Sequence, residues 1–386
     1  MDTTRTLRPT SPPIFQTATF AQASATEFGE FDYSRSGNPT RRVLEAELAC
    51  LEGGERAFAF TSGMAAIATL LGGLRAGDRL ITGADLYGGS VRYIERVLAA
   101  RGVGIEVVDT RDLASVQTRL AASSARTLVF LETPSNPLLA VSDLAALSAL
   151  TRAAGATLAV DNTMLSPALQ RPLELGVDLV VHSATKHLGG HGDLTAGCLI
   201  AGATAHGAEW AEELAFRQNA EGNALGPFDA WLLLRGLKTL RVRLAAECAS
   251  AQVVAEALAA HPRVRRVHYP GLASHPGAAL NARQARGAGC VLSFETGDAE
   301  LSRRWVEATR RFAIAVSFGC VSSSISLPYC MSHASVPRGS QRALPPRDLV
   351  RLSVGLEPAA ELVEDLERAF ERAGRERPGV SVGRSR

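Results

Sequence analysis

The sequence of 386 residues predicts an α/β protein, in which a large domain with a mostly parallel sheet precedes a smaller α+β domain. Two observations support this fold class. Up to about residue 240, short runs that are apolar on both faces alternate with helical patterns, as in a parallel sheet that helices cover on both sides. Beyond that point strand and helix patterns are mixed, which is typical of an α+β unit.

The elements of the large domain follow in order. The first forty residues are rich in Ser, Thr and Pro without periodicity, so we expect an extended arm. From Arg41, RRVLEAELACLEGG has apolar residues at helical spacing and ends at Gly53 and Gly54, which predicts a helix. Six apolar runs then predict strands: AFAF (57–60), RLIT (79–82), TLVFLE (127–132), TLAVD (157–161), DLVVHS (178–183) and GCLIA (197–201).

The smaller domain follows a long helical stretch at residues 227–260, and VRRVHYP, GCVLSFE and RFAIAVSF are its predicted strands. We therefore divide the chain into an arm with its helix (1–50), a large α/β domain (51–240) and a C-terminal α+β domain (241–386). The tail GRERPGVSVGRSR is basic and rich in turn formers, so we expect a solvated end.

Composition excludes several classes of protein. A net charge of +2 gives no reason to expect nucleic acid or an anionic membrane as partner. No apolar run approaches a bilayer span, and the start MDTTRTLRPTSPP lacks the apolar core of a signal peptide, which predicts a cytoplasmic location. The cysteines show neither C-x-x-C pairs nor zinc spacing, so we expect them to be reduced, mostly buried and without a metal.

Lys186, within VVHSATKHLGG (180–190), is one of only two lysines, although lysine and arginine together number 41. The other is Lys238. An amine can lose its proton near neutral pH and attack a carbonyl, whereas a guanidinium cannot. The residue is therefore either a Schiff-base lysine or an ordinary solvated lysine in an arginine-rich chain.

Polar residues at the ends of the predicted strands favour the first alternative. Ligands of open α/β sheets bind beyond the carboxyl ends of the strands. There the chain places a helix start that can hold a phosphate, an acid, an amide and two hydroxyls next to the lysine. Each alone has an ordinary explanation as a cap or a strand-end hydroxyl. These residues are Ser62, Gly63, Met64, Asn136, Asp161, Ser183 and Thr185.

Together these groups meet the requirements of pyridoxal 5'-phosphate (PLP). The cofactor needs a lysine for its aldehyde and an anion-binding helix start for its phosphate. It also needs a carboxylate that keeps the pyridine nitrogen protonated, so that the ring withdraws electrons from the substrate.

In this order the chain contains the stretches YSRSGNPTR, TSGMAAI, DLYGGS, TPSNPL, VDNTMLSPALQ, HSATKHLGGHGD, GPFDAWLLLRGLKTL, YPGLASHP and RLSVGLE. Over essentially its whole length it thereby resembles the Cys/Met metabolism family of fold-type-I PLP-dependent enzymes. The family includes cystathionine γ-synthase, cystathionine lyases and methionine γ-lyase. The resemblance implies a seven-stranded, mostly parallel sheet in the large domain.

The resemblance also implies roles for the residues around the cofactor. Lys186 would form the Schiff base and then move protons between Cα and Cγ of the substrate. Asp161 would pair with the pyridine nitrogen, and Tyr87 would stack on the ring and assist proton transfer. Asn136 would lie near the ring hydroxyl or the substrate carboxylate.

The phosphate would be bound where the helix that follows Ser62 begins, by the N–H groups of Gly63 and Met64. The hydroxyls of Ser183 and Thr185 would complete this site. In the family the arm reaches a neighbouring subunit, so Tyr33 and Arg35 would contact the partner's phosphate. The resemblance thus implies a homo-oligomer with a dimer as the minimum unit, assembled as a homotetramer.

The substrate residues implied by the resemblance are Arg351, Asn136, Arg92, Ser317 and Ser322. The guanidinium of Arg351 would bind the α-carboxylate as a two-pronged fork. Arg92 stands where γ-synthase relatives place a cation for a distal carboxylate, although it is equally well explained as a helix-surface arginine. Ser317 and Ser322 belong to SFGCVSSSISLPYCMSH, which aligns with a substrate-facing segment of the family.

YGGSVR and LSPALQ look most like cystathionine γ-synthase, so the predicted reaction is γ-replacement. In that reaction protons leave Cα and Cβ, the γ-group departs, and a nucleophile attacks a vinylglycine-type intermediate. Elimination, as in cystathionine γ- or β-lyase or methionine γ-lyase, remains an alternative. A specialised relative that uses S-adenosylmethionine or a nucleophile other than cysteine is another.

Two departures from the family pattern bear on this choice. Ser322 stands where γ-synthases and γ-lyases usually carry a glutamate that meets the distal ammonium, which predicts that cysteine is a poor nucleophile. His187 replaces a usual aromatic beside the lysine, either as neutral packing or as an added acid–base group.

Two hypotheses come from other classes. A catalytically inactive, regulatory relative would not need Lys186, Asp161, Tyr87 and Arg351 together. A nicotinamide-linked dehydrogenase would need a G-x-G-x-x-G after an early strand, and the sequence has none in that context.

Overall fold

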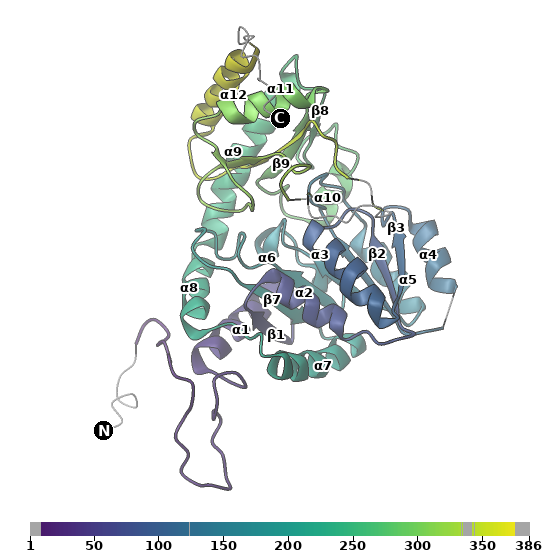
Figure 1. Cartoon of the computed structure of the whole chain (residues 1–386), viewed down its shortest axis with the longest axis vertical. Coiled ribbons are helices and arrows are strands. Elements are labelled where there is room, and N and C mark those ends of the chain that lie inside the picture. The colour runs from purple at the N-terminus through teal and green to yellow at the C-terminus, as the bar shows by residue number, and fades with distance from the viewer. Residues whose placement is uncertain (1–8, 123, 333, 335–341, 343, 375–386) are drawn as a thin grey trace, which may run out of the picture.

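The computed structural model describes residues 9–374, apart from residues 123, 333, 335–341 and 343. The predicted α/β class is confirmed, with a seven-stranded sheet in one half of the molecule and a five-stranded sheet in the other (Figure 1). Within the described part of the chain, no helix is long and apolar enough to cross a membrane. From residue 375 on, the predicted solvated tail lies outside the described residues.

The large sheet has the strand order β1-β7-β6-β5-β4-β2-β3, and β7 alone runs antiparallel to its neighbours. All six predicted strands are present, and β3 was not predicted. This strand lies at the edge of the sheet and is only partly buried, so it tolerates the charged Glu106. Glu106 interrupts the apolar run by which the other strands were predicted. The strands are β1 (Arg56–Phe60), β2 (Arg79–Gly83), β3 (Gly104–Val108), β4 (Thr127–Glu132), β5 (Thr157–Asp161), β6 (Leu179–His182) and β7 (Gly197–Ala201).

Helices cover both faces of this sheet, as the strands with two apolar faces require. In β4, Leu128 and Phe130 pack with α2, α3 and α7, whereas Val129 and Leu131 pack with α4 and α5 on the opposite face. The helices are α1 (Pro39–Glu52), α2 (Gly63–Gly72), α3 (Gly88–Tyr93), α4 (Leu113–Ala121), α5 (Leu144–Ala153), α6 (Ser166–Leu169), α7 (Ala205–Glu221) and α8 (Pro227–Leu237). Short turns of other helix types complete the layer: η2 (Ile94–Leu98), η3 (Ala99–Arg101) and η4 (Pro172–Leu175).

The predicted long helix at residues 227–260 is two helices, because the chain turns at Lys238 and Thr239 between α8 and α9 (Leu240–Ala260). In Figure 1, α9 rises from the large sheet to the smaller one. The predicted boundary at residue 241 falls in its first turn, and the division into domains stays a prediction.

The smaller sheet has the order β10-β11-β12-β9-β8. The three predicted strands are present, whereas β11 and β12 were not predicted as strands. Arg351 interrupts the apolar run of β12, although it is buried there. The elements are β8 (Arg266–His268), β9 (Val291–Glu295), β10 (Ala313–Ile314), β11 (Ser324–Ser326), β12 (Leu349–Ser353), α10 (Ala278–Gln284), α11 (Ala299–Ala308) and α12 (Ala359–Gly374).

The arm, residues 9–38, has no helix or strand apart from a bridge between Thr19 and Tyr33, and it projects from the body of the molecule in Figure 1. Asn38 ends it, because its side chain accepts the first free N–H groups of α1. The described cysteines are free, as expected, but Cys50 and Cys330 are exposed, so the expectation of mostly buried cysteines is only partly correct.

Candidate active site

A cavity of about 400 Å³ lies at the carboxyl edge of the large sheet, where it is closed by residues of the smaller half. Its size is in the range of small-molecule sites. All site residues predicted from the sequence line it except Tyr33, Arg35 and Ser322. Those that line it are Ser62, Gly63, Met64, Tyr87, Arg92, Asn136, Asp161, Ser183, Thr185, Lys186, Ser317 and Arg351.

Lys186 lies in the turn that follows β6, and its amine donates a hydrogen bond to the hydroxyl of Ser317. The pKa of Lys186 is lowered from 10.5 to about 8, mainly by burial and also by the nearby Arg351 guanidinium, while Asp161 opposes the shift. At pH 7 about one tenth of this amine is therefore unprotonated and nucleophilic, and at pH 8 about half.

Ser317 joins the lysine to the carboxylate-binding side of the cavity. Its backbone has a φ of 82°, which is unusual for a residue other than glycine and costs of order 1–3 kcal/mol. The carbonyl of Ser317 accepts a hydrogen bond from Arg351 Nη2 at 2.7 Å, and Arg351 Nη1 donates to Asn136 Oδ1 at 2.8 Å. The buried guanidinium is thus fixed in orientation and keeps further N–H donors for a ligand.

Asp161, at the end of β5, is a buried acid of the cavity. It accepts hydrogen bonds from the backbone N–H of Thr163, at 2.9 Å, and from the Thr163 hydroxyl. Burial raises the pKa of Asp161 in spite of these bonds. A protonated ring nitrogen is the kind of partner that would favour its charged form.

The start of α2 forms the anion-binding end. Ser62 caps the helix by accepting from Ala65 N at 3.0 Å, so the preceding N–H groups of Gly63 and Met64 are left for a ligand. A Cβ on Gly63 would lie 2.8 Å from Ser183 Cβ, so only glycine lets the helix start approach Ser183 this closely. The Thr185 hydroxyl is already paired with the backbone of Ala196.

These donors fit PLP, because the site offers an amine for the aldehyde, a helix N-terminus with a nearby serine hydroxyl for the phosphate, and a buried acid for the ring nitrogen. Tyr87 completes the wall beside them. A Cβ on Gly89 would lie 2.5 Å from Tyr87 Cε1, so Gly89 leaves room for this ring.

Tyr33 and Arg35 lie on the arm, away from the cavity of their own chain. Tyr33 is 43% exposed, and Arg35 Nη1 donates to the carbonyl of Asn219 at 2.6 Å and to its side-chain oxygen at 2.9 Å. Their predicted contact with a partner's phosphate stays a prediction.

Ser322 lines an adjoining cavity of about 770 Å³, together with Asp193, Asp229 and Cys320. That cavity shares Thr185 and Ser317 with the first one but does not reach Lys186. The predicted contact of Ser322 with substrate therefore depends on a ligand that extends past Ser317.

His187 turns away from the cavity into the interior, where its Nδ1 lies 3.9 Å from Cys290 Sγ. Burial, together with the Arg243 guanidinium, lowers the pKa of His187 to about 3, so the ring is neutral. Of the two alternatives left open by the sequence, the structure favours packing over an added acid–base group.

Glu132 is a lining residue that sequence reasoning missed. It was interpreted as the last residue of an apolar strand, yet its position at a strand end is the same signal that identified Asp161. Val316, Phe318 and Met331, from the smaller half, also line the cavity, and nothing in their local sequence indicates this.

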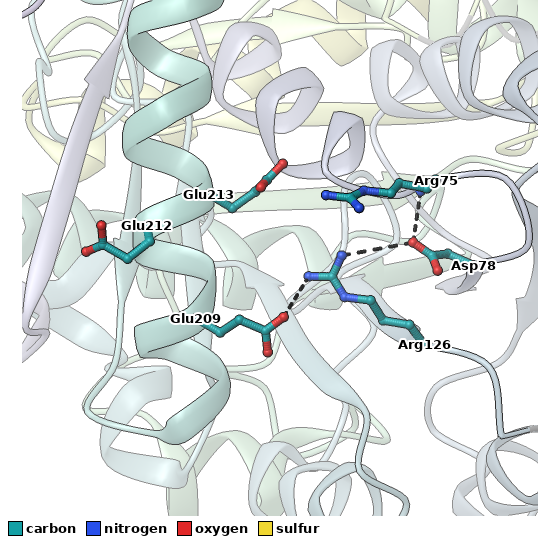
Figure 2. A pocket seen from close by; sticks show the side chains of 6 residues that line it. All are labelled: Arg75, Asp78, Arg126, Glu209, Glu212 and Glu213. Carbon is teal, nitrogen blue, oxygen red and sulfur yellow. Dashed lines mark hydrogen bonds and ion pairs between the residues drawn. The ribbon is translucent and has the colours of Figure 1, made fainter.

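A second hollow, of about 520 Å³, lies near the opposite edge of the sheet (Figure 2). Its charges largely satisfy one another, since Arg126 lies 4.0 Å from Asp78 and 3.2 Å from Glu209. Because α/β sheets bind ligands at the carboxyl edge, the Lys186 cavity is the candidate active site.

Comparison with known proteins shows the family to which the chain belongs. A family model described as Cys/Met metabolism PLP-dependent enzyme matches residues 1–371. A protein of Arabidopsis thaliana named chloroplastic cystathionine beta-lyase is 47% identical over 93% of this chain and 76% of its own length. Two solved structures are each 40% identical to this chain over 94% of its length. One is cystathionine gamma-lyase from Lactobacillus plantarum complexed with L-serine, with a TM-score of 0.90 and 94% of its own length matched. The other is cystathionine gamma synthase from Xanthomonas oryzae pv. oryzae in complex with cystathionine, with a TM-score of 0.88 and 93% of its own length matched.

The low pKa of Lys186 predicts the pH dependence of cofactor capture. In cofactor-free protein, the rate at which PLP becomes covalently attached should rise with pH and level off above about 8. Replacing Arg351 with Met removes a cation and should move the midpoint to higher pH. Arg92→Met, on the exposed side of the same cavity, is the matched control and should leave it unchanged. Borohydride trapping and mass spectrometry measure the rate, and an unmoved midpoint in Arg351→Met would contradict this account.

The close approach of Gly63 to Ser183 predicts weaker phosphate binding in Gly63→Ala. The new Cβ must push Ser183 away from the helix start, so PLP affinity should fall by about tenfold, roughly the loss of one charge-assisted hydrogen bond. Gly226→Ala is the control, because a Cβ there meets nothing within 4 Å. Equal affinity of the two variants, measured by equilibrium dialysis, would show that the approach does not matter.

Proposed function

Because the chain belongs to the Cys/Met metabolism family of PLP-dependent enzymes, we propose that it cleaves cystathionine by β-elimination. The family membership predicted from the sequence is confirmed, and with it the fold type, the cofactor and an amino-acid substrate. The proposed reaction breaks the Cβ–S bond of cystathionine and consumes water. Its products are homocysteine, pyruvate and ammonia.

The carboxyl groups that line the cavity are the reason to prefer elimination over replacement. Among the described lining residues the carboxyl groups are those of Asp161 and Glu132, and both are buried and hydrogen-bonded to Thr163 or Tyr87. Neither is free to hold a second ammonium group. Free cysteine must bind as a separate molecule before it can attack, whereas the distal half of cystathionine is held through its covalent bond to the anchored half.

The name of the curated relative supports β- rather than γ-elimination. The protein named beta-lyase is 47% identical to this chain, compared with 40% for the solved gamma-lyase and gamma-synthase. The choice between cleavage at Cβ and at Cγ rests on this difference and on the test below.

The residues of the cavity would divide the work as follows. When bound, PLP supplies an electrophilic aldehyde and a ring that withdraws electrons from Cα of the substrate. Asp161 would hold the proton of the ring nitrogen. The amine of Lys186 would remove the Cα proton and return a proton to the departing sulfur, with Tyr87 beside it. Arg351, fixed by Asn136, would bind the α-carboxylate.

The γ-replacement predicted from the sequence is the second candidate, and Arg92 favours it. This arginine lines the cavity at the exposed end of α3, where it could bind the distal carboxylate of an O-succinyl leaving group. The synthase-like stretches YGGSVR and LSPALQ point the same way.

A dimer is part of the proposal. The arm projects from the body (Figure 1), and the side chains of Tyr33 and Arg35 are not among those that line the cavity of their own chain. A second copy of the chain would bring these side chains to the phosphate end of the first. The homotetramer predicted from the sequence is compatible with this arrangement and stays a prediction.

The reaction is tested with cystathionine as the only substrate. We expect pyruvate and homocysteine in equal amounts, whereas γ-elimination would give 2-oxobutyrate and cysteine. In cystathionine recovered from heavy water, the β-route should place deuterium at Cα and none at Cβ, because Cβ takes up a solvent proton only in the pyruvate that is released. Lys186→Ala is the control and should be inactive. Synthesis of cystathionine from O-succinylhomoserine and cysteine with a higher kcat/KM than cleavage would overturn the proposal in favour of γ-replacement.

The shared site is tested by mixing two inactive variants. Lys186→Ala lacks the amine, and Arg35→Ala lacks the arm contact, so a mixed dimer keeps one complete site if the arm serves the partner. Random reassembly should then restore about one quarter of wild-type activity, since half of the dimers are mixed and each has one working site. No recovery, with subunit exchange verified by native mass spectrometry, would mean that Arg35 acts within its own chain.

A further inference from the structure

Glu132 and Asp161 lie side by side at the carboxyl edge of the large sheet. β4 ends at Glu132, β5 ends at Asp161, and the two residues are register partners in parallel strands. Neighbouring strands are about 4.8 Å apart, and register partners point to the same face of a sheet. Both residues line the cavity, and each is only 7% exposed. Two buried carboxyl groups this close do not both carry a charge at low cost.

The surroundings decide which of the two is charged. Asp161 accepts a hydroxyl and an N–H from Thr163, and the nearby Lys186 also favours its ionised form. The ionised form of Glu132 is stabilised less, because the hydrogen bonds that this carboxyl group accepts from the described residues come from two backbone N–H groups and from no hydroxyl or cation. Burial raises the pKa of Glu132 well above its usual value, and the charge of Asp161 raises it further.

The other charges around Glu132 come from two elements. Asp85, in the turn after β2, is a further acid that raises the pKa of Glu132. Among the described residues, the buried Arg342 guanidinium is a nearby cation, and it donates to the carbonyls of Gly83 and Ala84. Burial and the two acids disfavour a charge on Glu132, and Arg342 opposes them.

Glu132 also holds the two loops that carry cofactor-facing residues. Its Oε1 accepts the backbone N–H of Tyr87 at 2.7 Å, and the carboxyl group accepts the N–H of Asn136 as well. The Asn136 side chain in turn accepts from Arg351, which donates to the Ser317 carbonyl. A continuous set of hydrogen bonds thus leads from Glu132 to the loop that contacts the lysine.

We propose that Glu132 is a positioning residue that acts as a neutral carboxylic acid: it fixes the backbones of Tyr87 and Asn136 and leaves Asp161 as the negative charge of the pair. The inference rests on the cofactor-binding role proposed for Asp161 and is independent of the reaction that follows. A neutral neighbour lets Asp161 ionise opposite the ring nitrogen, whereas a second carboxylate would add a repelling charge to the same buried space.

The test compares the same change, carboxyl to amide, at the two neighbours. Glu132→Gln keeps the acceptor oxygen and the neutral charge, so PLP affinity and kcat/KM should stay within about threefold of wild type. Asp161→Asn removes the required charge and should lower kcat/KM by at least about a hundredfold and shift the pH titration of the bound cofactor's absorbance. Glu132→Ala removes the acceptor and should weaken PLP binding by about tenfold, which the Gln variant rescues.

Three results would overturn the proposal. The first is a Glu132→Gln enzyme as impaired as Asp161→Asn, or with the same shift of the absorbance titration, because Glu132 would then act through its charge. The second is an unimpaired Glu132→Ala enzyme, because the residue would position nothing. The third is an infrared difference spectrum between wild type and Glu132→Gln that lacks a carboxylic-acid carbonyl band. This last measurement stays decisive if Glu132→Ala does not fold, and all readouts of the bound cofactor are independent of the substrate that the enzyme cleaves.

Discussion

The contact between Lys186 and the loop that begins at Ser317 is the interaction on which the site depends. Lys186 belongs to the large sheet, whereas Ser317 and Arg351 belong to the smaller half. The lysine amine, the serine hydroxyl and the guanidinium meet only where the two halves pack together. The guanidinium also donates a hydrogen bond to Asn136, which belongs to the large-sheet half. Neither half alone contains both Lys186 and Arg351, so packing between the halves sets the geometry of the proposed chemistry.

Burial at this junction has an energetic consequence. Lowering the pKa of Lys186 from 10.5 to about 8 costs the ligand-free fold about 3 kcal/mol at neutral pH. The sign follows from proton binding, because between pH 8 and 10.5 the unfolded lysine is protonated and the folded one is not. The penalty is thus fully present below pH 8 and is lost as the pH rises toward 10.5. If the cofactor binds covalently to Lys186, as proposed, the buried primary amine is lost and this penalty is relieved, which would couple cofactor binding to stability.

The sequence predicted the parts of the site that are local in the chain. Asp161 and Lys186 follow apolar runs, and parallel strands must bring such ends together. Arg351 and Ser317 were assigned by resemblance alone, since no local pattern shows that the smaller half closes the cavity. Strands β3 and β12 were missed because Glu106 and Arg351 break their apolar patterns. The position of Ser322 depends on how the loop turns at Gly319, with a φ of 74°, and spacing does not reveal that turn.

In the described part of the chain, the Lys186 cavity has few carboxyl groups that are free to bind a ligand, and this bears both on cofactor binding and on the choice of substrate. The cofactor needs one negatively charged carboxylate near its ring nitrogen. In the proposed arrangement Asp161 carries this charge, and the neighbouring Glu132 is neutral. Beside Lys186 the described lining residues of the cavity include Arg92 and Val316 but no uncommitted acid, and Asp193 and Asp229 line the adjoining cavity past Ser317. The ammonium group of a free cysteine therefore finds no negatively charged partner among the described residues beside Lys186. The distal ammonium group of cystathionine needs none, because the rest of that molecule is already anchored. A cavity of this charge therefore favours breaking a bond within one bound amino acid over joining two.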